Sequence, residues 1–292
     1  MIPQLLINIL VTSATLLVVA VSFSIIYSTA RFFNFAHGVV YAWGAYFTYL
    51  MARVAGMNLG MAIAIAVVGT ALLGMGIELA IYKPLRKQKA SSLVLLVTSL
   101  GVYIVLQNVI SLLFGDDTKS IRMWPVREGW NVLGARITPV QVIIIVSAVV
   151  LFVAIMLFLK WTNMGKAMRA VASDSELALI SGINVNNVIL FTFALGSALA
   201  GSAGILVSLD VDMTPTMGMR ALLMGVVAMI IGGRNSIPGV ALGALLLGMA
   251  QHLGAWQISS KWQDAIVFVI LLIFLLARPQ GFLGKKIRTA HV

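Results

Sequence analysis

The run VQVIIIVSAVVLFVAIMLFL at residues 140–159 carries no charged side chain over twenty consecutive residues. A helix of that length crosses a hydrocarbon core of about 30 Å. Apolar runs of similar length occur five more times, and together the six predict six membrane-spanning helices. The other five cover residues 5–27, 35–52, 59–82, 92–114 and 188–209.

The overall composition also indicates a protein embedded in lipid. Of the 292 residues, 61% are hydrophobic and 10% are charged, whereas soluble domains carry roughly 25% charged residues. The length accommodates about eight spans of ~20 residues and leaves no room for a separate soluble domain. We therefore predict one all-α transmembrane domain over residues 1–292, with about eight transmembrane or half-membrane helices.

The last third of the chain departs from the pattern of full-length spans. Residues 221–231 and 239–255 are shorter apolar runs that flank the turn-prone sequence GGRNSIPG at 232–239. Two half-length helices around a loop, forming a broken or re-entrant segment, fit this pattern best. A final run at 262–277 ends at Arg278 and Pro279, which stop the helix.

Basic residues outnumber acidic ones by 20 to 9, which gives a formal net charge of +11. A polar chain with this balance would suggest nucleic-acid binding. Here the basic residues stand in short gaps between apolar runs, as in loops held at an anionic cytoplasmic leaflet. We therefore place Arg31, the loops at 83–89 and 160–169 and the C-terminus inside. The N-terminus and the loop 115–138 then lie outside, where that loop either docks a partner or is a solvated connection.

The sequence lacks the residues that several kinds of catalysis require. It has no cysteine, and its three histidines show no metal-site spacing. GGRNSIPG lacks the Lys-Ser/Thr ending of a phosphate-binding loop, and neither G-x-S-x-G nor H-E-x-x-H occurs. We expect a chain that is not an enzyme, holds no cofactor or metal of its own and binds no nucleic acid.

The stretch MGKAMRAVASDSELALISGINVNN at 164–187 is charged yet has helical spacing. Ser173 and Asp174 can cap a second short helix whose first turn contains Glu176. We therefore expect two short helices outside the bilayer. Such a segment either docks into a groove of a cytoplasmic protein or rests on lipid headgroups.

A few polar residues fall inside the apolar runs, where polar groups tend to face the bundle interior or a transport path. Glu78 lies one turn from the basic cluster that begins at Lys83, so we expect an interfacial ion pair. Asn34 and His37 are three residues apart and would share one face of a helix. Helix capping or packing explains these two residues about as well as ligand binding.

Small residues at four-residue spacing predict close helix contacts. Gly196, Ala200 and Gly204 form one such stripe in the run 188–209, and Gly239 with Gly243 forms a second. Both stripes are expected to serve packing.

Several stretches, taken together and in order, resemble one family: the membrane permeases of ATP-driven (ABC) importers for branched-chain amino acids. They span nearly the whole chain, and their order is more specific than any one of them. They are NFAHG at 34–38 with the segment 41–46, the loop 165–184 that ends in SGIN, FALGSALAG at 193–201, GG at 232–233 with SIPG at 236–239, and RPQG at 278–281.

The resemblance implies a multi-pass permease of the bacterial inner membrane, with the all-helical fold of vitamin B12 and ribose importers. It also implies a second related permease chain, two ATP-binding subunits that hold ATP and Mg²⁺, and a soluble protein that delivers the substrate. Residues 166–182 resemble the segment that couples the permease to the ATPase. The coupling residues implied are Lys166, Arg169, Asp174, Glu176 and Gly182.

The sequence departs from the family pattern at Arg234 and Asn235, where small residues such as Leu-Gly are more frequent. These two residues, with Asn34, His37 and Glu78, are the candidates for the translocation pathway. The departure leaves the substrate open between branched-chain amino acids and urea or short amides. An ion-gradient-driven carrier that uses Glu78 and His37 is a third possibility, and a membrane subunit with a purely structural role is a fourth.

Overall fold

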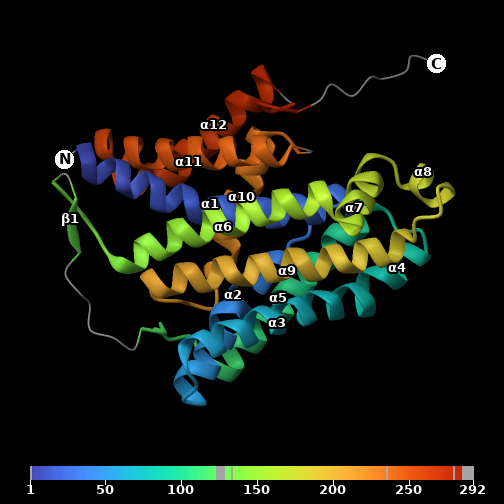
Figure 1. The fold of residues 1–292 in the computed structure, drawn as a ribbon, viewed down its shortest axis with the longest axis horizontal. Coiled ribbons are helices and arrows are strands. Elements are labelled where there is room, and N and C mark those ends of the chain that lie inside the picture. Colours follow the sequence, from blue (N-terminus) through green and yellow to red (C-terminus); the bar gives the residue numbers. More distant parts are fainter. Residues whose placement is uncertain (1, 123–128, 133, 235, 279, 285–292) are drawn as a thin grey trace.

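The computed structural model describes residues 2–122, 129–132, 134–234, 236–278 and 280–284. Helices run along the long axis of the molecule, with α1, α6 and α9 side by side (Figure 1). The first half of the described chain contains α1 Ile2–Ala30, α2 Ala36–Tyr49 with the π-helical turn η1 Leu50–Val54, α3 Leu59–Ile77 with the π-helical turn η2 Glu78–Tyr82, α4 Lys83–Lys87 and α5 Ser92–Phe114.

The second half begins with a small antiparallel hairpin, β1 Trp130–Val132 and β2 Ala135–Ile137. The helices that follow are α6 Pro139–Trp161, α7 Asn163–Ser173, α8 Ser175–Ile180, α9 Val185–Asp210, α10 Met217–Gly232, α11 Ile237–Gln257, the 3₁₀ turn η3 Ser260–Trp262 and α12 Gln263–Ala277.

Seven helical segments among the described residues are long and apolar enough to cross a membrane, which confirms the all-α multi-pass prediction. Five of the six predicted runs lie in such segments, and the sixth does not. That run, 35–52, became α2 and η1, which is not among the seven. Twelve of the 14 residues of α2 are buried, so its surface faces protein rather than lipid and tolerates polar and small side chains.

The prediction of two half-length helices near the C-terminal end was right for α10 and wrong for α11. The 16 residues of α10 form a short apolar helix. The 21 residues of α11 are long enough to span a membrane. It begins earlier than the apolar run because the Ser236 hydroxyl caps it by accepting from the Gly239 amide, with Pro238 in its first turn. It ends at Gln257, two residues beyond the run, and the polar residues Gln251 and His252 inside the run find partners on α10 and α1.

Glycines bring the central helices into backbone contact, as the two predicted stripes require. A Cβ at Gly204 would overlap the carbonyl oxygen of Tyr41 on α2, and one at Gly196 would overlap Ile26 on α1. In the second stripe, Gly239 and Gly243 meet the backbone of α10 at Gly232 and Ala228. Both stripes are confirmed as packing surfaces.

The basic connections gather at one end of the molecule. Figure 1 shows α4, α7 and α8 at the right-hand end, with the N-terminus and β1 at the left. The Arg31 guanidinium donates to the carbonyl oxygens of Ala172 and Ser173 on α7. This arrangement agrees with a single cytoplasmic end, called the inner end below.

The opposite, outer end is closed by a tie between two connections. Lys119 pairs with Met213 through both backbone hydrogen bonds, and Arg122 donates to the Asp212 carboxylate at 2.6 Å. This hydrogen bond holds the pKa of Asp212 below its usual value, so the pair stays charged in mildly acidic surroundings. The link from α9 to α10 is thereby attached to the chain that leaves α5.

We predict that Gly204→Ala destabilises the protein by about 1–3 kcal/mol, because the added methyl group overlaps the Tyr41 carbonyl in a tightly packed contact. The matched control is Gly101→Ala on α5, where nothing lies within 4 Å of the new methyl group. Thermal unfolding in detergent measures both. Equal midpoints for the two variants would contradict the role of this glycine.

Candidate functional site

The inner end carries a helix pair that leaves the transmembrane bundle. The chain turns at Thr162, whose hydroxyl accepts from the Gly165 amide and so caps the start of α7. On its inward side α7 buries Gly165, Met168 and Val171. Met168 and Val171 join the same hydrophobic cluster as residues of α1, α6 and α9. The helix is therefore attached to the bundle rather than held by flexible linkers.

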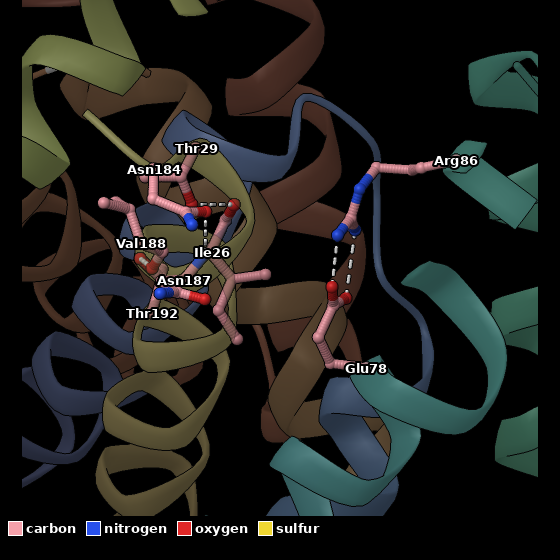
Figure 2. A network of polar contacts seen from close by, with 8 residues as sticks. All are labelled: Ile26, Thr29, Glu78, Arg86, Asn184, Asn187, Val188 and Thr192. Atoms are coloured by element: carbon pink, nitrogen blue, oxygen red, sulfur yellow. Dashed lines mark hydrogen bonds and ion pairs between the residues drawn. The ribbon is translucent and has the colours of Figure 1, made fainter. Parts of the chain in front are cut away.

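The second helix of the pair, α8, has well-defined ends. The Asp174 carboxylate accepts from the amides of Glu176 and Leu177 at 2.9 and 3.0 Å, as the sequence predicted. The helix ends at Ile180, and Gly182, two residues further on, has a φ of +83°, a left-handed conformation that favours glycine. Asn184 then caps α9 by accepting from the Asn187 amide at 3.2 Å (Figure 2).

The outward face of this pair carries exposed charged residues and, on α8, exposed aliphatic residues. Lys166, Arg169, Asp174, Glu176 and Gly182, the five coupling residues implied by the resemblance, are all exposed. On α8 three large aliphatic side chains are exposed as well: Leu177 and Leu179 at 62% and Ile180 at 84%. We call these three residues the α8 apolar face. Three aliphatic residues in a six-residue helix outside any span indicate a contact surface. This pattern is visible in the sequence, but none of the three is among the five implied coupling residues.

Glu78 lies at the inner end of the bundle, in a group of polar side chains separate from the α7–α8 pair. Its carboxylate is 1% exposed and forms a two-pronged ion pair with Arg86, one contact of which measures 3.0 Å (Figure 2). The predicted ion pair is therefore present, with Arg86 as the partner. The π-helical turn η2 begins at Glu78 and ends at Tyr82, and the Tyr82 hydroxyl donates to Asn34 Oδ1 at 2.8 Å.

Asn34 and His37 do not share a helix face, contrary to the prediction, because α2 begins only at Ala36. Asn34 belongs to the connection before α2, and its side chain meets Tyr82. The ring of His37 points to α1 instead, with Nε2 2.8 Å from the Ser22 hydroxyl. Both residues are buried. Capping was one open explanation, but neither side chain caps α2.

The remaining pathway candidates lie at the connection from α10 to α11. The carbonyl of Arg234 accepts from the Ser24 hydroxyl, and its exposed guanidinium lies 3.4 Å from the Tyr27 hydroxyl. Asn235 falls outside the described residues. The structure thus joins Asn34 to the segment of Glu78 and places His37 and Arg234 separately along α1.

The geometry shows no catalytic arrangement among these groups. No three His, Asp or Glu side chains in the described part of the chain lie close enough to hold a metal ion. Glu78 is paired with Arg86, and His37 is buried with Nε2 against the Ser22 hydroxyl and its ring packed on Phe23. The α7–α8 pair, in contrast, presents exposed charged and aliphatic side chains on which a partner can dock.

Comparison with known proteins identifies the family to which this chain belongs. Residues 5–276 match the family model described as branched-chain amino acid transport system / permease component. The chain belongs to this permease family. It is 32% identical to the high-affinity branched-chain amino acid transport system permease protein LivH of Escherichia coli, over 93% of this chain and 92% of that protein. Identity to BraD of Pseudomonas aeruginosa, a permease protein of the same description, is also 32%, covering 97% and 95%.

The fold itself also occurs in a solved structure. PsaBC from Streptococcus pneumoniae, in complex with Fab, superposes with a TM-score of 0.55 at 14% identity, covering 95% of this chain and 93% of that chain. The permease is thus the membrane-spanning component of a transport system, and it works with further components of that system.

We predict that Glu78→Ala destabilises the permease by about 3–5 kcal/mol, because it leaves the Arg86 guanidinium without its counter-charge in a largely buried position. The double variant Glu78→Leu/Arg86→Met is expected to recover most of the loss, since no lone charge remains. Thermal unfolding midpoints in detergent test this order. The alternative outcome, a double variant as unstable as the single one, would show that the pair stabilises through its charges.

Proposed function

We propose that this permease is the membrane-spanning subunit of an ATP-driven importer for branched-chain aliphatic amino acids. In this proposal a soluble binding protein delivers the substrate from the outer side. A second related permease chain completes the path, and two ATP-binding subunits bind ATP and Mg²⁺ at the inner end. Support comes from membership of the family along nearly the whole chain and from the substrate class in the names of its relatives.

The observation that carries the proposal is the α8 apolar face. A capped helix with three exposed aliphatic side chains suits a hydrophobic groove on a cytoplasmic protein, as in helix-in-groove recognition. Lipid headgroups are the alternative surface. Helices that lie on membranes are rich in Lys and Arg, whereas α8 contains Glu176, is capped by Asp174 and has no basic residue. Because α8 itself lacks that basic pattern, a protein groove is the better partner for it.

Movement at α8 has a direct route into the bundle. Since α7 is buried against α1, α6 and α9 through Met168 and Val171, displacement of the pair shifts the inner ends of these helices. Closure of the ATP-binding subunits would then change the side on which the path opens. The permease supplies no covalent chemistry in this scheme, and ATP is hydrolysed on the partner chains.

The ion-driven alternative receives less support from the geometry. Such a carrier needs an ionisable group in the membrane that binds and releases its cation. Glu78 is already neutralised by Arg86 within the same chain, and His37 is held against Ser22.

The first test is purification of the tagged permease from its native membrane in mild detergent, followed by mass spectrometry and an ATPase assay. We expect an ATP-binding subunit and a second permease to co-purify, with ATPase activity stimulated by a binding protein loaded with leucine. Stimulation by urea instead would contradict the substrate. A permease that purifies alone and transports on an ion gradient would overturn the importer.

We predict that Leu177→Asp/Ile180→Asp reduces the ATP-binding subunit retained on the permease at least tenfold, because the charges oppose entry of the α8 apolar face into a groove. The control is Asn186→Asp, which adds a negative charge at an exposed position on α9 nearby and should leave retention unchanged. Quantitative mass spectrometry of the purified complexes measures both. Full retention in the double variant would remove α8 as the docking element.

A further inference from the structure

A groove with a volume of about 360 Å³ runs along the outer half of α9, between α3 and α6. Figure 1 shows α9 between these two helices, and it packs against both. Val146 and Val150 of α6 form one wall and are more than half exposed, while Ile63 of α3 lies in the other. Leu206 and Leu209 of α9 are buried at the floor. We call this space the α9 groove.

The α9 groove lies at the depth of hydrocarbon chains. Its lining on α6 extends from Ile143 to Leu151, about 6–18 Å of helix from the outer end at Pro139. None of the residues 140–159 is charged, and the helix is long enough to cross the membrane. The exposed wall of the groove therefore faces the outer half of a hydrocarbon core about 30 Å thick.

The lining of the groove is unsuited to a charged ligand. Eight of the ten described residues that line it are Ile, Val or Leu, and the other two are Ser147 and Ser202. The Ser202 hydroxyl already donates to the Ala198 carbonyl of its own helix at 2.8 Å. An amino acid bound here would find no ionic partner for either of its charges, which is costly in an apolar site. The α9 groove therefore suits an apolar ligand and not the proposed substrate.

The width of the groove decides between two apolar occupants, a lipid chain and a helix of another protein. Along about 12 Å of α6, its volume corresponds to a mean width of roughly 6 Å. A helix with its side chains is about 10–12 Å wide, and helices that meet closely in lipid do so over small residues. The exposed part of the α6 wall instead consists of the bulky Ile143, Val146 and Val150. A single acyl chain fits such a slot, whereas a helix does not.

We propose that the α9 groove binds one acyl chain of an outer-leaflet phospholipid, lying lengthwise between α3 and α6. Without an occupant, the side chains that line the groove lose van der Waals contacts on one side, and the acyl chain restores them. The inference goes beyond the proposed function, because it holds whichever substrate the permease carries. Since α6 leads into α7 and α9 follows α8, the bound chain contacts both helices that carry the α7–α8 pair.

The test uses the permease, purified with the components that accompany it, in vesicles of phosphatidylethanolamine and phosphatidylglycerol. A small fraction of the phosphatidylethanolamine carries a photoreactive diazirine in the middle of one acyl chain. We expect illumination to label the stretch 202–209 of α9, which peptide mass spectrometry locates. Val146→Phe/Val150→Phe should reduce this label at least fivefold, because the two rings occupy the groove.

The matched control is Val149→Phe/Val153→Phe. These two valines lie on the same helix with the same spacing, and they are 51% and 46% exposed against 55% and 58% for the groove pair. They do not line the groove, so the control should be labelled as strongly as the native permease. Undiminished labelling in Val146→Phe/Val150→Phe, or an equal loss in both double variants, would overturn the lipid site.

A second measurement distinguishes lipid from protein as the occupant and does not depend on the stability of the phenylalanine variants. Because the chain has no cysteine, Val150→Cys provides a single thiol at the groove, to which a short photoreactive benzophenone is attached. Illumination in native membranes should give phospholipid adducts of the permease, identified by mass spectrometry. A cross-link to a second permease chain as the main product would show that protein covers the groove, and it would overturn the lipid site while leaving the importer intact.

Discussion

The architecture depends on direct backbone contact between α2 and its neighbours α9 and α10. At Gly204 and Gly218 the absence of a side chain lets the carbonyl oxygens of Tyr41 and Gly38 reach the facing helix. In lipid, helix association gains nothing from expelling water, so close packing must supply the attraction. The consequence is a helix, α2, that is enclosed by protein although it is less apolar than the spans around it.

The positions of the charged side chains are also constrained by the lipid surroundings. Where a charge lies within the bundle it has a partner on its own chain, as Glu78 has in Arg86, because a lone charge in a medium of low dielectric constant is too costly. The exposed charges lie elsewhere: on α7 and α8 beyond the inner end of the bundle, and in the ion pair between Arg220 and Asp264 on α10 and α12.

Several features could be predicted from the sequence because they are local. Apolar runs long enough for the membrane predicted the spans, and Asp174 before Glu176 predicted the cap of α8. The full length of α11 could not be predicted in this way, because its first turn, capped by Ser236, lies within the turn-prone sequence 232–239, and the polar residues Gln251 and His252 interrupt its apolar run. Their side chains are satisfied by Met224 on α10 and Thr12 on α1, and contacts between distant segments leave no local pattern.

The sequence by itself determined the class of the protein, the approximate number of its spans, the end at which its basic loops gather and its resemblance to a permease family. Each follows from composition, from hydrophobic length or from motifs in order along the chain. Tertiary structure alone decided that α2 is enclosed, that Asn34 meets Tyr82 while His37 meets Ser22, and that Arg220 and Asp264 face each other 44 residues apart in the chain. The physical reason is that these contacts depend on how helices cross, which glycine contacts set in space and no periodicity along the chain records.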